Sequence, residues 1–157
     1  MILSLKAIGI SDVSKVDFID RPEQRSFLAA LQTLIKLGAL DPLTASMTQT
    51  GSEMAILPTD PIYSRLLVTA LKPEYAMVKD AVATIVAMLS VENVFYGSSS
   101  DSTTIDKQKS KTMKRRKRLL NQSSDHLSLL QVFTAWQEQA NNKVSFCNEH
   151  LINIKSL

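Results

Sequence analysis

The sequence predicts a mainly α-helical fold organised around one central apolar helix. Apolar residues recur every three or four positions in several stretches, the spacing that places them on one helix face. Asp-Pro or Lys-Pro pairs precede several of these stretches, and proline fits the first turn of a helix. Between the stretches there is little room for strands.

The size and composition are those of a globular chain. It has 157 residues, 45% hydrophobic and 21% charged, enough for one domain or two small ones. The longest apolar segment is interrupted by Lys79 and Asp80, which leaves it too short to cross a membrane, and we expect no membrane contact. The lone Cys147 excludes an internal disulfide and fits a reducing compartment.

The first segments predict two helices. Residues 2–8 carry apolar side chains at near-helical spacing and end at Gly9. The next helix follows Arg21-Pro22-Glu23, with its cap at Asp20 or Arg21 and Pro22 in the first turn. Its core-facing stripe is Phe27, Leu31, Leu34 and Ile35, and Gly38 ends it.

The next stretch predicts a small strand and two further helices. Residues 43–48 form the strand or wing, and Thr48 or Thr50 caps a helix that ends near Leu57. Asp60-Pro61 then opens a helix up to Lys72-Pro73. Its inward residues are expected to be Leu66, Leu67 and Ala70. The order of elements over residues 1–72 suits a degenerate, reduced winged helix.

Residues 73–157 predict a small helical bundle. Its central helix runs from Pro73 to Leu89, is apolar almost all round from Ala81 to Leu89, and should therefore be buried there. A basic insertion follows at about 98–122, and Asp125 then caps a helix with an apolar stripe of Leu129, Val132, Phe133 and Trp136. The last stripe is Cys147, Leu151 and Ile154. Because neither end of the chain has a helix stop or cap, we expect a longer parent protein.

Positive charge is concentrated in one segment. Residues 101–118 hold eight Lys or Arg against two Asp, a charge of +6 that leaves −3 on the rest of a chain whose total is +3. Such a run is typical of a nucleic-acid contact or a nuclear import signal. A solvated insertion with no partner is the alternative.

The sequence offers no active site. It has no phosphate-binding glycine loop and no dinucleotide fingerprint, so we expect no cofactor on this chain. His126 and His150 lack partners at metal spacing, so we expect no metal. Cys147 and His150 could be read as a nucleophile and its base, but a buried core cysteine is the favoured interpretation.

Several motifs in fixed order resemble one family over nearly the whole chain. The residues 84–96, TIVAMLSVENVFY, look like the signature of the helicase-associated region of DEAH-box RNA helicases. Residues 5–10, 18–22, 37–40, 50–61, 125–130 and 147–157 resemble other blocks of the same region. Two departures stand out, because the family usually has Gly where this chain has Ser124 and Arg-Pro where it has Gly97-Ser98.

The resemblance implies a winged-helix domain over residues 1–72 and a ratchet-like helical bundle over residues 73–157. The parent would carry motor domains that use ATP and Mg²⁺ before this chain, and an oligonucleotide-binding barrel after it. In the family the bundle lines a tunnel for single-stranded RNA, the winged helix packs on a motor domain, and an activating protein can bind its surface.

The expected RNA-contacting residues combine this resemblance with local chemistry. Asn93 offers an amide at the end of the signature, and His126 stands at a helix N-terminus, which favours phosphate. Capping of the helix junction is the alternative role for both, and Phe95 is expected in the core. The basic run adds the candidates Lys114, Arg115, Arg116, Lys117 and Arg118.

Three functions follow for the chain. The first is a non-catalytic region of an RNA helicase, acting in ribosome biogenesis or pre-mRNA splicing, with a nuclear or nucleolar location. The second is a protein–protein scaffold that docks helicase activators without touching RNA. The third, a winged-helix DNA regulator, is disfavoured because residues 22–37 hold few cations, among them Arg25 and Lys36.

Overall fold

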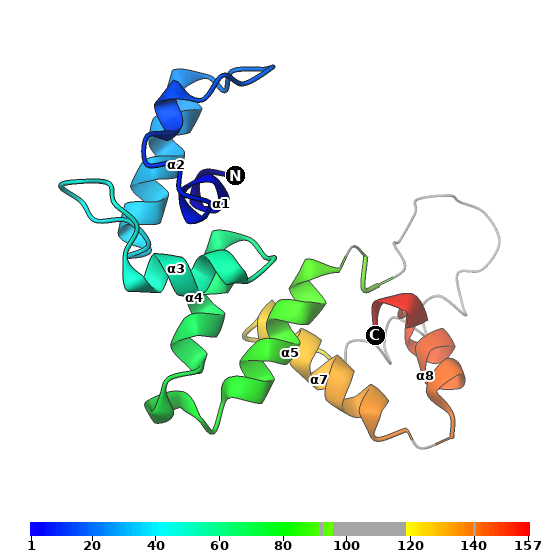
Figure 1. Cartoon of the computed structure of the whole chain (residues 1–157). Helices are drawn as coiled ribbons and strands as arrows, with labels where there is room; N and C mark the ends of the chain where they lie inside the picture. Colours follow the sequence, from blue (N-terminus) through cyan, green and yellow to red (C-terminus); the bar gives the residue numbers. More distant parts are fainter. Residues whose placement is uncertain (92, 96–118, 140) are drawn as a thin grey trace. The chain divides into compact units, whose positions relative to one another are not determined.

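A computed structural model describes residues 1–91, 93–95, 119–139 and 141–157 (Figure 1). Seven α-helices and no strand occur in these described ranges, which confirms the mainly α-helical prediction. None of the helices there is long and apolar enough to cross a bilayer. Contacts divide the chain into two compact units, Met1–Lys79 and Asp80–Leu157, and each is described by itself.

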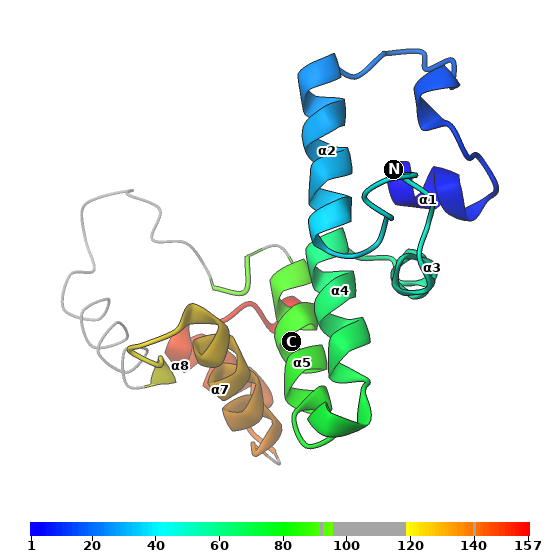
Figure 2. The same cartoon turned by 90° about the vertical axis from the view of Figure 1, so that its left-hand side faces the viewer.

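The first unit contains four helices and two short 3-10 turns. Helix α3 packs against both α1 and α4, and α1 also contacts α2 (Figures 1 and 2). The bounds are α1 Ile2–Ala7, η1 Val13–Lys15, α2 Gln24–Lys36, α3 Gln49–Ile56, α4 Pro61–Ala70 and η2 Pro73–Tyr75. The core residues are Ile2, Leu3, Val13, Leu34, Ala39, Leu40, Met54 and Val68.

Helix α2 starts later than the sequence predicts. Its N-cap is Glu23, whose extended ψ of 134° keeps Pro22 outside the helix, so the expected cap at Asp20 or Arg21 is wrong. The predicted apolar stripe is confirmed, because Leu34 is buried and the other three residues pack against the same core. Gly38 ends the helix with a φ of +70°.

Gly51 allows α3 to lie directly against the chain after α2. A Cβ placed on Gly51 would overlap the carbonyl oxygen of Ala39, so no side chain fits at this position without a shift of the backbone. The predicted cap of α3 is confirmed at Thr48, whose hydroxyl accepts from the Gly51 N–H at 3.0 Å and donates to the Gly38 carbonyl at 2.6 Å.

The predicted strand at residues 43–48 is a turn instead. One antiparallel bridge joins Leu40 and Met47, and Asp41 accepts hydrogen bonds from Leu43 and Thr44 inside the loop. Leu43, at 93% exposure, lies in this loop. The Leu43 and Thr44 N–H groups are bonded to the Asp41 carboxylate, so they are not available to pair with another strand. The winged-helix assignment of residues 1–72 therefore remains a prediction.

Helix α4 has the predicted cap but a different buried face. Asp60 accepts from the Ile62 N–H and Pro61 takes the first position, as expected. Leu66 is 42% exposed, so its expected inward position is wrong, whereas Ala70 is buried as expected. The buried face instead includes Ser64, whose hydroxyl lies 2.9 Å from that of Thr59 and is thereby satisfied in the interior.

The second unit contains α5 Lys79–Ser90 except for its first residue, together with α7 Asp125–Gln137, α8 Lys143–His150 and the turn η3 Ile154–Ser156. Its core consists of Met88, Val94, Val132, Cys147 and Ile152. The predicted stripe of α7 is confirmed, since Leu129, Phe133 and Trp136 pack around the buried Val132. Lys143 covers the Trp136 ring at 4.2 Å.

The central helix differs from its prediction in length and burial. It begins at Lys79, because residues 73–75 form a separate 3-10 turn and Met77 is fully exposed. Val86 and Met88 are buried, but Ala83 and Ala87 are exposed, so burial all round is wrong. The small alanine side chains line a cavity of 490 Å³ between α5, α7 and the C-terminal residues.

The last predicted stripe is correct only at Cys147. Leu151 has a left-handed backbone (φ 54°) and ends α8. Beyond it the helical period is lost, so Ile152 takes the core position while Leu151 and Ile154 are 36% and 40% exposed.

Candidate nucleic-acid interface of the second unit

Asn93 lies where the chain leaves α5 and meets the C-terminal segment. Phe95 forms an antiparallel bridge with Ile152, and the Asn153 N–H donates to the Val94 carbonyl at 2.9 Å. The Asn93 backbone is left-handed, with a φ of 55°, and the residue is exposed. The junction therefore fixes the backbone of Asn93 while leaving the residue at the surface.

The aromatic residue of this junction belongs to the core. Phe95 packs against the cluster that contains Val94 and Ile152, so its expected core position is confirmed. Glu92 and Tyr96, which belong to the same end of the signature stretch, lie outside the described residues.

The N-terminus of α7 is capped by Ser124. Its extended backbone (φ −157°, ψ 126°) and its side chain, which accepts from the Leu127 N–H at 3.3 Å, identify it as the cap. The predicted cap, Asp125, is therefore wrong, and Asp125 is the first helical residue. His126 follows it and is exposed, next to the positive end of the helix dipole.

Ser128 holds the segment before α7, a role that sequence reasoning missed. Its buried hydroxyl accepts from the Asn121 N–H at 2.8 Å and lies 3.0 Å from the Ser124 carbonyl. The Asn121 side chain in turn accepts from the Ser123 N–H at 2.9 Å. A signal was present, because Ser128 is a polar residue four positions before the buried Val132, on the same helix face.

The predicted RNA-contacting residues do not form one contiguous group in the described part of the chain. Asn93 and His126 both belong to the second unit, but no hydrogen bond or ion pair joins them within the described residues. Lys114, Arg115, Arg116, Lys117 and Arg118 lie outside those residues. The structure therefore gives positions for two of the seven candidates.

The described part of the second unit carries few cations. Its only lysines are Lys143, which covers Trp136, and Lys155. Its carboxylates are Asp80, Asp125, Glu138 and Glu149. A polyanion would therefore be attracted weakly by these residues, and most of the unit's positive charge is in the segment 107–118.

Cys147 is a core residue, as favoured from the sequence. It is 1% exposed, and burial raises the pKa of its thiol, which disfavours the reactive thiolate. The Nδ1 atom of His150 lies 3.2 Å from the Phe146 carbonyl, and its ring stacks on that of Phe146 at 4.5 Å. His150 is thus engaged with Phe146 rather than poised as a base for Cys147.

Comparison with known proteins relates this chain to a protein family and to a splicing helicase. Residues 60–129 match the family described as helicase associated domain (HA2), ratchet-like. Over 158 aligned residues, the chain is 35% identical to the pre-mRNA-splicing factor ATP-dependent RNA helicase prp22 of Schizosaccharomyces pombe. That alignment covers 99% of this chain and 12% of the relative, so the chain spans a small part of the relative's length.

Proposed function

The chain belongs to the helicase-associated region of DEAH-box RNA helicases, and from this premise we propose that it helps to hold single-stranded RNA. The observation that carries the proposal is the 35% identity that extends over 99% of the chain to an ATP-dependent RNA helicase. Motor domains elsewhere in the parent would bind and hydrolyse ATP with Mg²⁺, and this region would contribute to RNA binding rather than to hydrolysis. The splicing relative favours a nuclear role in pre-mRNA splicing over ribosome biogenesis.

The geometry of the second unit supports this role. Single-stranded nucleic acid is held through its phosphates and its base faces, largely without reading sequence. His126 is exposed in the first turn of α7, at the positive end of the helix dipole, an arrangement suited to a phosphate. Asp125 would repel a phosphate, so its contribution is to the helix dipole. The exposed Asn93 adds an amide that can donate and accept.

The charge distribution sets the expected mode of binding. With Lys143 and Lys155 as the lysines of the described second unit, we expect weak affinity from its folded part. The basic run from Lys114 to Arg118 would add contacts to phosphates, and each such contact makes binding more sensitive to salt.

Crosslinking of RNA to the parent protein tests this function. A single-stranded RNA carrying photoreactive bases is irradiated with the whole protein, and the crosslinked peptides are mapped by mass spectrometry. We expect crosslinks in the peptides that contain Asn93 and His126. Crosslinks confined to other parts of the parent would overturn the RNA-holding role.

A second candidate function is a docking surface for an activating protein on the first unit. It is favoured by large apolar residues that this unit leaves in solvent, namely Ile19 at 105%, Leu43 at 93% and Ile56 at 81% exposure. If docking is the sole function, charge reversal at Lys114–Arg118 leaves RNA crosslinking of the parent unchanged. A loss of crosslinking in that variant would favour the RNA-holding role.

A further inference from the structure

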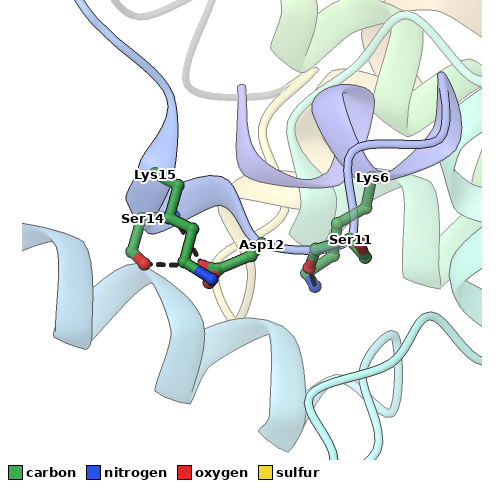
Figure 3. A network of polar contacts seen from close by, with 5 residues as sticks. All are labelled: Lys6, Ser11, Asp12, Ser14 and Lys15. Atoms are coloured by element: carbon green, nitrogen blue, oxygen red, sulfur yellow. Dashed lines mark hydrogen bonds and ion pairs between the residues drawn. The ribbon is translucent and has the colours of Figure 1, made fainter.

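The side chain of Asp12 organises the turn that follows α1 (Figure 3). One carboxylate oxygen accepts from the Ser14 N–H at 3.1 Å and from the Ser14 hydroxyl at 2.6 Å. The other oxygen pairs with the Lys15 ammonium at 3.1 Å. These contacts hold the turn η1, whose Val13 is 3% exposed in the core of the first unit.

Ser14 faces a cavity that also has a cationic residue in its wall. The residue is exposed, and it lines a cavity of 380 Å³ together with Arg21. The other lining residues are Val13, Phe18, Pro22, Gln24 and Phe27. Ser14 and Arg21 therefore line the same cavity, and the guanidinium group of an arginine can bind a phosphate with two hydrogen bonds.

The segment that begins at Asp17 is open to an enzyme, whereas the Lys15 and Val16 N–H groups still bond to the Asp12 and Val13 carbonyls. Residues 16–23 contain no helix or strand, and among the described residues no backbone hydrogen bond involves residues 17–22. Ile19, in the middle of this segment, is fully exposed. A segment without backbone bonds can be drawn into the cleft of a modifying enzyme at little energetic cost.

We propose that Ser14 is a phosphorylation site for an acid-directed protein kinase. Such kinases select a serine that is followed three residues later by a carboxylate, and Asp17 occupies that position. In the reaction the Ser14 Oγ attacks the γ-phosphorus of ATP, and a new O–P bond forms. The bond between that phosphorus and the β-phosphate bridging oxygen breaks, ADP leaves, and the hydroxyl proton passes to the catalytic carboxylate of the kinase.

The phosphorylated turn has different partners from the unmodified one. The phosphate adds close to two negative charges at pH 7, and it would stand beside the carboxylate that now accepts the Ser14 hydroxyl. Repulsion releases Asp12 from Ser14, while Lys15 and Arg21 pair with the phosphate. The turn that anchors Val13 is loosened as a result.

The test uses the whole parent protein with ATP and casein kinase 2, followed by mass-spectrometric mapping of the phosphate. We expect phosphate on Ser14, loss of that phosphate in Ser14→Ala, a strong reduction in Asp17→Asn, and no change at Ser14 in the control Ser11→Ala. A peptide of residues 8–24 shows that the kinase is active on this sequence. Phosphate on the peptide but not on the protein, or on neither of them, would overturn the site. Equal phosphorylation of Ser14 in the unmodified protein and in Asp17→Asn would overturn the acid-directed selection.

Hydrogen exchange measures the structural consequence in the same sample. The amide of Ser14 should exchange faster after phosphorylation, by up to about tenfold for the loss of one hydrogen bond. Unchanged exchange in the fully phosphorylated protein would overturn the loosening of the turn.

Discussion

The hydroxyl of Ser156 lies 3.4 Å from the carbonyl oxygen of Asn93, although 63 residues separate them along the chain. Together with the bridge between Phe95 and Ile152, this contact closes the C-terminal segment onto the exit of α5. Asn93 adopts a left-handed backbone at this junction. Its backbone role and its side-chain role can therefore be separated by substitution.

Asn93→Gly and Asn93→Val separate the two roles. Glycine adopts the left-handed conformation freely, whereas valine is strained there by about 1–2 kcal/mol. We expect Asn93→Val to lower the free energy of unfolding by about that amount in urea titration, and Asn93→Gly to leave it nearly unchanged. Equal stability of the two variants would show that the junction does not fix this backbone.

Gly51→Ala tests the close approach of α3 to Ala39. The added Cβ would overlap the Ala39 carbonyl oxygen, so α3 must move away from the core. We expect a loss of about 2–4 kcal/mol in unfolding free energy, in the range of strongly disruptive core changes. Glu53→Ala, at an exposed site of the same helix, is the matched control and should change stability by less than about 0.5 kcal/mol.

Ser124 stands where the family usually has glycine. Serine and glycine are both good helix caps and alanine is a poor one, so the stability of variants at this position tests the capping role. We expect Ser124→Ala to destabilise by about 1 kcal/mol, because the Leu127 N–H loses its acceptor. Ser124→Gly should lose only a few tenths of a kcal/mol. Thermal unfolding that ranks glycine below alanine would contradict the assignment of Ser124 as the cap.

The loop at residues 41–46 should loosen in acid. Hydrogen bonds from the Thr44 backbone and hydroxyl, and from the Leu43 N–H, lower the pKa of Asp41 from its ordinary value of 3.8. A lowered folded-state pKa means that the stabilisation is present above pH 3.8 and is lost as the pH falls through the lower, folded-state value. NMR titration of the Asp41 carboxyl carbon and the Thr44 amide should show both changing together below pH 3.8. A midpoint above that pH would contradict the hydrogen bonds.

Cys147 should react slowly in the native protein. Its burial and the resulting rise in thiol pKa both oppose attack by the thiolate. We expect a thiol-specific reagent at pH 8 to label it only at the rate of unfolding, and quickly in denaturant. Rapid native labelling would show an exposed, activated cysteine.

Local sequence signals predicted most of the helices and several of their caps. The sequence predicts Asp60, and either Thr48 or Thr50, as caps because their short side chains can accept from first-turn N–H groups, and Thr48 and Asp60 do so. Stripes such as Leu129 to Trp136 were also readable, because apolar periodicity reflects the face that is buried.

The errors arise where a specific side-chain hydrogen bond or backbone conformation overrides the apolar pattern. The sequence predicts an inward Leu66, but the Thr59–Ser64 hydrogen bond allows Ser64 into the interior instead. The sequence predicts Leu151 in a helical apolar stripe, but its left-handed backbone ends α8 there, and the next residue, Ile152, takes the core position. For the candidate site, the family resemblance predicts Asn93 and His126. The hydrogen bond between the Ser128 hydroxyl and the Asn121 N–H is visible only in the structure.

The most direct test of the RNA-holding role is the affinity of the parent protein for a single-stranded RNA, measured by fluorescence anisotropy at low salt. The double variant Asn93→Gly with His126→Ala removes both exposed side chains while preserving the left-handed backbone. Gln131→Ala, exposed on α7, is the matched control. We expect the double variant to bind about five- to thirtyfold more weakly, as for the loss of one or two kcal/mol, with unchanged thermal stability. Equal affinity of the double variant, the control and the unmodified protein would contradict an RNA-facing role for this junction.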